Sequence, residues 1–233
     1  SLLVCLLSIG CSIHSENNLN VSMQEEKRKL SSVVYVQAAQ GSFNHQAIKR
    51  LYKGKTGLDY RFSGTPLNTF EHAAKNDAQA FVALRNDLVP GHLVKATVEA
   101  LKEYKIISVT AGVKQRIEMC LLRTQSAVEQ QLALKTIASH PAALAQIGKW
   151  KAGKRYQEIE EPKGTSEAAR ILSEGLYADD SGVIGPKALV ELYTNLVIVE
   201  TGIQDREDNT TLFGQLWVQK REQSVSEQQA TTE

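Results

Sequence analysis

The stretch VVYVQAAQGSFNHQAIKRL, residues 33–51, has the pattern of a strand, a turn and a helix in succession. The valine-rich run at 33–36 is typical of a strand, and Gly41 is a residue that turns favour. Beyond the turn, four apolar residues recur at the spacing of one helical face: Phe43, Ala47, Ile48 and Leu51. The body of the protein is therefore predicted to begin near residue 33.

The same alternation continues along the chain. Apolar and β-branched runs predict strands at 60–62, 80–84, 106–109, 117–122, 136–138, 181–184, 197–199 and 212–218. Helical patterns lie between them, at 66–74, 93–101, after Pro141, from Thr165 and at 186–192; Ser139-His140-Pro141 supplies an N-cap candidate and an early proline. This alternation predicts an α/β fold with mainly parallel sheet.

Composition sets the class of protein. The 233 residues suffice for one domain or for two small lobes that share a cleft. A net charge of +1 lacks the cationic excess of non-specific nucleic-acid binding, so no nucleic-acid partner is expected. The histidines at 45, 72 and 92 show no metal-ligand spacing, and no Walker-type glycine-rich loop occurs, so neither a metal nor another cofactor is expected.

The first residues predict an export leader, residues 1–13. The apolar run at 2–9 is shorter than the roughly 20 residues that span a bilayer, but it suits the core of a signal peptide. Cys11 follows Gly10, as in a lipoprotein cleavage box, so a lipid anchor at Cys11, a cleaved soluble signal and a buried apolar segment all stay open. The expected location is exported (periplasmic, lipid-anchored or secreted), or cytoplasmic if the leader is misassigned.

Three further boundaries follow from the composition. Residues 14–32 are polar and predict a linker, 33–220 form the body, and 221–233 predict a disordered tail. Cys5 and Cys11 lie in the leader and Cys120 alone lies in the body, so no internal disulfide is expected.

The body contains several short sequence motifs, here called strings, whose order along the chain indicates a family. The most specific is SHPAALAQ at 139–146; the others are GSFN at 41–44, RND at 85–87, GTSEAA at 164–169, IQD at 203–205 and NTTLF at 209–213. In order and separation they resemble the prephenate dehydratase family. The resemblance implies two α/β lobes arranged like a small type II periplasmic binding protein, with the active site in the cleft between them. It also implies a catalytic domain without the ACT regulatory domain that normally follows the last string, and a homodimer is a further expectation.

The resemblance implies prephenate as a small-molecule substrate. The family's reaction expels the ring hydroxyl and a carboxylate as water and carbon dioxide, which leaves phenylpyruvate. A protein that holds two carboxylates and helps hydroxide to leave needs hydroxyl side chains, helix N-termini and one proton donor. Thr211 matches the threonine of the family's last motif and is the catalytic candidate; the alternative is an ordinary strand threonine.

The substrate-binding candidates occupy other motif positions. Ser42, Thr165 and Ser166 lie at helix starts, where free N–H groups can meet a carboxylate, and each is alternatively a plain helix cap. Asn86, at the end of a buried strand, and Phe213 complete the matched positions.

Two positions depart from the family pattern. Arg85 stands where the family has a carboxylate, and Leu212 stands where the last motif has arginine. One hypothesis is that Arg85 takes over carboxylate anchoring, because guanidinium groups bind carboxylates in a bidentate manner. The other is that Arg85 points to solvent and the site has decayed. His140, next to Pro141, is expected to have a structural role.

Three functions therefore stay open. The first is a prephenate dehydratase of L-phenylalanine biosynthesis. The second is a prephenate decarboxylase-like enzyme that does not aromatise the ring, and the changes at Arg85 and Leu212 favour it. The third is a non-catalytic exported binding protein for an aromatic or cyclohexadienyl carboxylate, which the predicted leader favours.

Overall fold

The computed structural model describes residues 32–88 and 91–222. The predicted leader, the lipid-anchor candidate Cys11, almost all of the linker and the tail from residue 223 lie outside the described residues. Within these two ranges, no helix has both the length and the apolar character needed to cross a bilayer.

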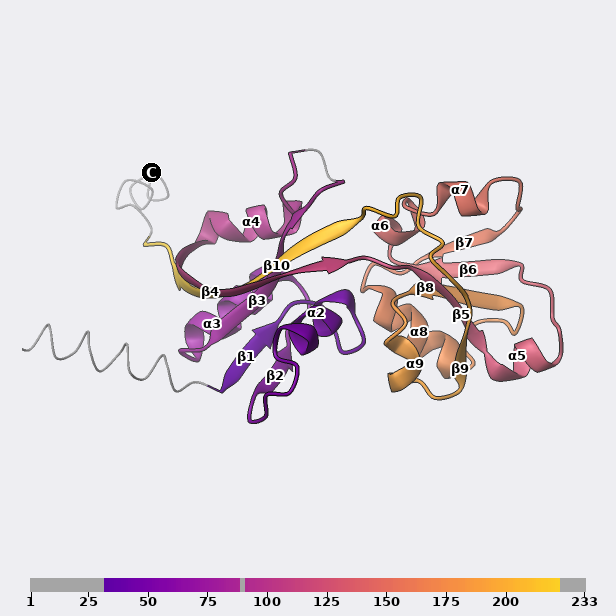
Figure 1. Cartoon of the computed structure of the whole chain (residues 1–233), viewed down its shortest axis with the longest axis horizontal. Coiled ribbons are helices and arrows are strands. Elements are labelled where there is room, and N and C mark those ends of the chain that lie inside the picture. Colours follow the sequence, from indigo (N-terminus) through magenta and orange to yellow (C-terminus); the bar gives the residue numbers. More distant parts are fainter. Residues whose placement is uncertain (1–31, 89–90, 223–233) are drawn as a thin grey trace, which may run out of the picture.

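The chain folds into two lobes that lie side by side along the long axis (Figure 1). We call residues 32–116 with 210–222 lobe 1, and residues 117–209 lobe 2. The sheet of lobe 1 has the strand order β2 (Asp59–Phe62), β1 (Val33–Val36), β3 (Gln79–Asn86), β10 (Thr210–Lys220), β4 (Tyr104–Arg116). The sheet of lobe 2 has the order β7 (Gln157–Glu160), β6 (Thr136–Ser139), β8 (Ser181–Gly185), β5 (Cys120–Thr124), β9 (Leu196–Thr201).

Helices accompany both sheets. In lobe 1 they are α2 (Phe43–Leu51), α3 (Pro66–Lys75) and α4 (Lys95–Glu103). In lobe 2 they are α5 (Gln125–Glu129), α6 (Pro141–Leu144), α7 (Gly148–Lys151), α8 (Thr165–Ser173) and α9 (Leu189–Leu192). The side-chain oxygens of Ser42, Thr65 and Thr124 accept hydrogen bonds from backbone N–H groups in the first turns of α2, α3 and α5, which explains where these helices begin.

The predicted two-lobed α/β class is confirmed, but the sheets are mixed rather than mainly parallel. In lobe 1, β1 is parallel to β2 and β3, whereas β10 is antiparallel to β3 and β4. In lobe 2, β6 is parallel to β7 and β8, whereas β5 is antiparallel to β8 and β9. In lobe 1 the reason is the path of the chain. It enters β10 from lobe 2, so β10 begins at the junction, whereas β3 ends there, and the two strands run in opposite directions.

Two segments connect the lobes, and they are hydrogen-bonded to one another. The N–H of Ile117 donates to the carbonyl of Asn209 at 2.8 Å, and the N–H of Ile203 donates to the carbonyl of Met119 at 3.1 Å. The side chain of Gln204 accepts from the N–H of Met119 at 2.9 Å. The strand predicted from residue 117 therefore begins only at Cys120, because 117–119 cross between the lobes.

One hydrophobic core extends through the junction. It contains Val34, Phe81 and Phe213 of lobe 1 together with Ile137 and Ile184 of lobe 2. Because buried apolar side chains from both lobes belong to one cluster, their burial favours a defined arrangement of the lobes.

Candidate active site

Thr211 lies at the junction of the lobes, on the first part of β10. In the antiparallel ladder it is opposite Asn86, the last residue of β3. The side-chain amide of Asn86 donates a hydrogen bond to Thr211 Oγ1 at 2.8 Å. Thr211 is only 5% exposed, and among the described residues no acceptor for its own hydroxyl proton is present. The structure thus brings the catalytic candidate and Asn86 into direct contact.

A chain of side-chain amides continues from Asn86 into lobe 2. Asn86 Nδ2 also donates to Asn209 Oδ1 at 2.9 Å, and Asn209 Nδ2 donates to Gln146 Oε1 at 2.6 Å. Gln146 Nε2 in turn donates to the carbonyl of Ala142 at 2.8 Å. Three strings that are far apart in the sequence therefore meet in one network that orients Thr211.

The string at 203–205 supports the same network from the second connection. Asp205 donates its backbone N–H to the carbonyl of Gln146 at 2.7 Å. Its carboxylate accepts from the N–H groups of Gly148 at 2.9 Å and Lys149 at 2.7 Å, at the start of α7. Asp205 is therefore a helix cap that fixes the backbone of Gln146.

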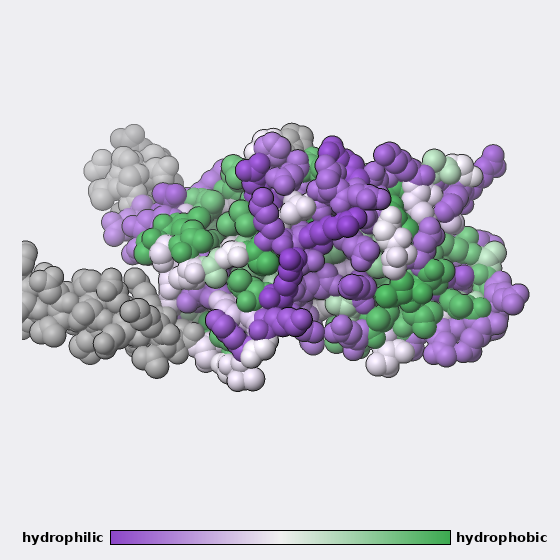
Figure 2. Space-filling view, in the orientation of Figure 1, coloured by the Kyte–Doolittle hydropathy of each residue, from purple (hydrophilic) through white to green (hydrophobic). Residues whose placement is uncertain are grey.

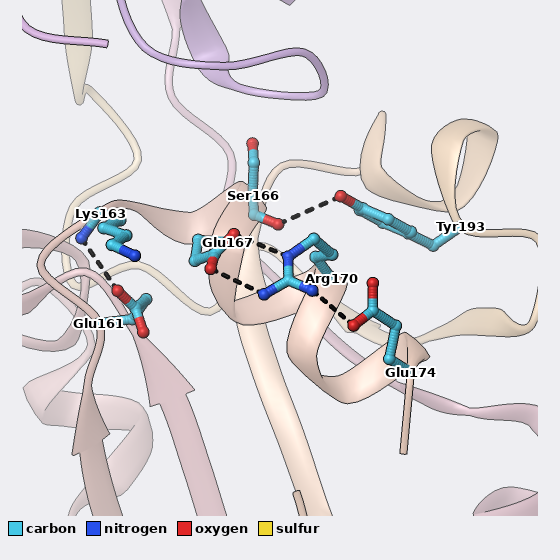
Figure 3. A network of polar contacts seen from close by, with 7 residues as sticks. All are labelled: Glu161, Lys163, Ser166, Glu167, Arg170, Glu174 and Tyr193. Atoms are coloured by element: carbon cyan, nitrogen blue, oxygen red, sulfur yellow. Dashed lines mark hydrogen bonds and ion pairs between the residues drawn. The ribbon is translucent and has the colours of Figure 1, made fainter. Parts of the chain in front are cut away.

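Ser166 lies in the first turn of α8, near the junction. It is 6% exposed, and its Oγ has no hydrogen-bond partner among the described residues. Figure 3 shows this hydroxyl pointing away from Glu167 and Arg170, toward the ribbon of lobe 1, while the Ser166 carbonyl accepts from the hydroxyl of Tyr193 at 3.5 Å. A buried, unpaired hydroxyl at a helix start is a suitable donor to an anionic ligand.

The charged side chains of α8 are paired with one another. Arg170 donates to both carboxylate oxygens of Glu167 at 2.9 Å and contacts Glu174 at 2.5 Å (Figure 3). Hydrogen bonding to Arg170 lowers the pKa of Glu167. Because Arg170 neutralises Glu167, this carboxylate repels an anion at the start of α8 less than a free one would.

Ser42 and Gly41 bring the start of α2 against lobe 2. Ser42 Oγ accepts from the N–H of His45 at 3.3 Å, so Ser42 is a helix cap, as its alternative interpretation held. Gly41 has φ of +83°, and a Cβ there would lie 2.9 Å from Leu189 and 3.8 Å from Ser166 Oγ. Only glycine fits this backbone and this close approach, and the starts of α2 and α8 consequently face each other.

A cavity of about 170 Å³ opens between the lobes beside this region. Its lining consists of Gln46, Gln115, Arg116, Glu118 and Lys187. Figure 2 shows hydrophilic residues gathered across the middle of the molecule, over the junction, with hydrophobic patches toward either side. The cavity and the Thr211 network thus occupy the same junction.

Arg85 is not brought into this site. It lies opposite Leu212 in the β3–β10 ladder, one residue from the Asn86–Thr211 pair. Successive strand residues point to opposite faces, so Arg85 and Leu212 lie on the face away from Thr211. Arg85 is exposed and donates to Asp87 at 3.1 Å. The geometry contradicts the hypothesis that Arg85 anchors a carboxylate beside Thr211.

Replacement of Arg85 by alanine is therefore expected to leave kcat/KM for prephenate, the substrate that the sequence resemblance implies, within about twofold of wild type. The exposed pair with Asp87 contributes little to stability, and the side chain is remote from the hydroxyl of Thr211. Steady-state kinetics of the purified variant measure this. A drop in kcat/KM of more than tenfold would restore Arg85 as an anchor.

Phe213 and Thr165 occupy different environments. Phe213 is 2% exposed and stacks on Phe81 with ring centroids 5.8 Å apart, so it belongs to the core and does not reach a ligand. Thr165 is half-buried in the first turn of α8, and its Cβ is 3.4 Å from the position a Cβ would take at Gly185. Of this pair, only Thr165 stays a candidate for ligand contact.

Two histidines serve as helix-start acceptors. His140 Nδ1 accepts from the N–H of Ala142 at 3.1 Å, so His140 is the N-cap of α6. Ser139, the other cap candidate, is buried at the end of β6 and donates to the carbonyl of Ile184 at 2.6 Å. His45 Nδ1 accepts from the N–H of Gly41 at 3.0 Å. Burial lowers the pKa of both His45 and His140, and Lys49 lowers that of His45 further.

These lowered pKa values predict a stability loss in mild acid. Because the folded state holds His45 and His140 neutral, the unfolded chain takes up protons at the two histidines near pH 6.5 while the folded chain resists. We expect the unfolding free energy, measured by urea denaturation, to decrease from pH 7 to pH 5. His140→Asn, which keeps a cap acceptor at every pH, should show a shallower decrease. Equal slopes for the variant and wild type would contradict the assignment.

The sequence interpretation missed part of the site. Gln146 lies in the string at 139–146 and Asn209 in the string at 209–213, but neither was predicted as a site residue. Buried side-chain amides at the ends of strands and helices are nevertheless suited to hydrogen-bond networks. Arg116 and Lys187 carried no sequence signal, since each is a single cation whose position depends on how the lobes meet. Across 32–88 and 91–222, no three His, Cys, Asp or Glu side chains cluster in a way that could hold a metal ion.

A sequence model of the prephenate dehydratase family matches residues 34–222. The chain belongs to the prephenate dehydratase family. The match covers both lobes, so all the elements that build the Thr211 network lie inside the family domain. No protein of curated function matches the sequence.

Solved structures show the same fold. The chain is similar to prephenate dehydratase from Arthrobacter aurescens in complex with L-Phe (18% identity, TM-score 0.62, 82% of this chain and 61% of that chain). It is also similar to prephenate dehydratase from Staphylococcus aureus subsp. aureus Mu50 (15%, 0.59, 82% and 67%) and to GqqA, described as a novel type of quorum quenching acylase (20%, 0.60, 82% and 65%). The chain thus spans about two thirds of these relatives. At such identities the likeness establishes the fold but does not establish the reaction.

Proposed function

We propose that this prephenate dehydratase family member binds prephenate in the junction between its lobes and converts it to phenylpyruvate, water and carbon dioxide. One observation supports the proposal above the others: Thr211 accepts a hydrogen bond from Asn86 at 2.8 Å and keeps its own proton for a ligand. A hydroxyl that accepts a hydrogen bond donates a stronger one in turn, because hydrogen bonds polarise one another.

The reaction places modest demands on the protein. The bond from the ring to the carboxylate breaks, and its electron pair completes the aromatic ring as the ring hydroxyl departs. The departing oxygen needs a proton to leave as water, and Thr211, oriented by Asn86 and the amide chain to Gln146, donates toward it. Orientation by this rigid network lowers the cost of reaching the reactive geometry.

Neutral donors are available for the ring carboxylate. The start of α8 directs backbone N–H groups toward the junction, and the buried hydroxyl of Ser166 lies beside them without a partner. Such donors hold an anion without the strong stabilisation that a cation would give to the carboxylate that must leave.

Incubation of the purified chain with prephenate at neutral pH tests the proposal, with products resolved by NMR and chromatography. Phenylpyruvate and carbon dioxide in equal amounts are the expected products. A decarboxylated, non-aromatic dihydro product would identify a decarboxylase instead. Unchanged prephenate together with saturable binding would identify a binding protein, and unchanged prephenate without binding would exclude all three functions.

A further inference from the structure

The cavity between the lobes has a charge pattern that Thr211 chemistry does not use. Two cationic side chains line it, Arg116 at the end of β4 and Lys187 next to Pro186 in lobe 2. One carboxylate, Glu118, lines it from the first connection between the lobes. The lining therefore has one positive charge in excess, which one ligand carboxylate would neutralise.

Neither cation is tightly engaged elsewhere. In the described part of the chain, Lys187 has no ion-pair or hydrogen-bond partner for its ammonium group. Arg116 meets only Glu207, at 3.7 Å, and the Glu207 side chain is 91% exposed. Such a rim contact contributes little, so Arg116 adds its positive charge to that of Lys187 in the cavity lining.

The charges of Lys187 and Glu118 both act on the buried thiol of Cys120. Burial and the charge of Glu118 raise the pKa of the Cys120 thiol to about 11, and the charge of Lys187 opposes this rise. Lys187 and Glu118 line the same cavity, yet they form no ion pair within 4 Å among the described residues. Glu118 therefore does not neutralise Lys187 through an ion pair.

The cavity adjoins the reacting hydroxyl through β4. Gln115, which lines the cavity, is the cross-strand partner of Thr211, and Arg116 is the partner of Thr210. Opposite residues of adjacent antiparallel strands lie about 4.5–5.5 Å apart. Gln115 therefore links the cavity to the face of the sheet that carries Thr211, whereas Arg116 shares the opposite face with Thr210.

We propose that Lys187 of lobe 2, which lines the cavity together with Gln115 of lobe 1, is the cationic anchor for the side-chain carboxylate of a 2-oxo acid ligand. This inference rests on the proposed function and names the group that each part of the ligand contacts.

The chemistry decides which carboxylate the anchor holds. A cation on the ring carboxylate would stabilise the charge that decarboxylation removes and would slow the reaction. The pyruvyl carboxylate keeps its charge from substrate to product, so an ammonium or guanidinium group there binds without this penalty. The affinity for the product phenylpyruvate should consequently depend on the anchor as much as the affinity for prephenate does.

Calorimetric titration with phenylpyruvate, which retains the pyruvyl carboxylate and is not consumed, tests the anchor. For Lys187→Gln we expect Kd for phenylpyruvate to rise about tenfold or more, the size of one charged hydrogen bond. In prephenate kinetics, KM should rise similarly while kcat changes by less than about threefold. Raised salt should weaken wild-type binding more than binding to Lys187→Gln.

Lys95→Gln, which removes an exposed lysine on α4 outside the cavity lining, is the matched control and should leave Kd and KM unchanged. Equal Kd values for wild type and Lys187→Gln would overturn the anchor while leaving the proposed function intact. The anchor would also be overturned if Lys187→Gln turned over prephenate with a lower kcat and an unchanged KM. A wild-type chain that binds neither prephenate nor phenylpyruvate would contradict the proposed function itself.

Discussion

Thr211→Val is expected to reduce kcat for prephenate by about 10²–10⁴-fold, the usual contribution of a positioned proton donor. Valine has nearly the shape of threonine but lacks the hydroxyl that Asn86 orients at 2.8 Å. Asn86 keeps its second acceptor, Asn209, so the amide chain should survive the change. Steady-state kinetics at neutral pH provide the measurement.

Two neighbouring variants control this result. Thr211→Ser keeps the hydroxyl and should retain kcat within about tenfold of wild type. Thr210→Val removes a hydroxyl one residue away, on the other face of β10, and should leave kcat unchanged. If Thr211→Val kept kcat within threefold of wild type, Thr211 would be an ordinary strand residue.

Phe213→Ala is expected to lower the free energy of unfolding by about 3–5 kcal/mol. The ring is 2% exposed, stacks on Phe81 and belongs to the core that both lobes share. Its loss leaves a cavity two residues from Thr211, so the melting temperature should fall by roughly 10 °C. Urea denaturation and calorimetry measure both quantities.

Leu176→Ala is the matched control for a lost apolar side chain. Leu176 is 66% exposed, so its truncation should change the unfolding free energy by no more than about 0.5 kcal/mol. A Phe213→Ala chain that unfolds within 1 kcal/mol of wild type would contradict a tightly packed junction.

Patterns of apolar residues predicted most of the fold because burial imposes periodicity. The strand predicted at 33–36 was correct to the residue, and the four apolar residues predicted on one helical face all lie in α2. The strand at 157–160 was missed, since its sequence, Gln-Glu-Ile-Glu, is that of an edge strand with polar faces. The extension of β4 to Arg116 was missed because Ala111 and Gly112 interrupt the β-branched pattern.

The site was predicted in part, and the reason differs by residue. Thr211, Asn86 and Ser166 were found through short strings, and the structure brings all three to the junction. Arg85 was misjudged because the face on which a strand residue lies depends on pairing register, which a local string does not contain. Lys187 was missed because its role depends on the approach of two lobes that share no sequence pattern.

Release of carbon dioxide from prephenate labelled in its ring carboxylate tests the central claim most directly. We predict that label is released in proportion to the concentration of wild-type chain, with one equivalent of phenylpyruvate formed, and that Thr211→Val at the same concentration releases at least a hundredfold less. Release at the same rate with and without the protein would contradict the account.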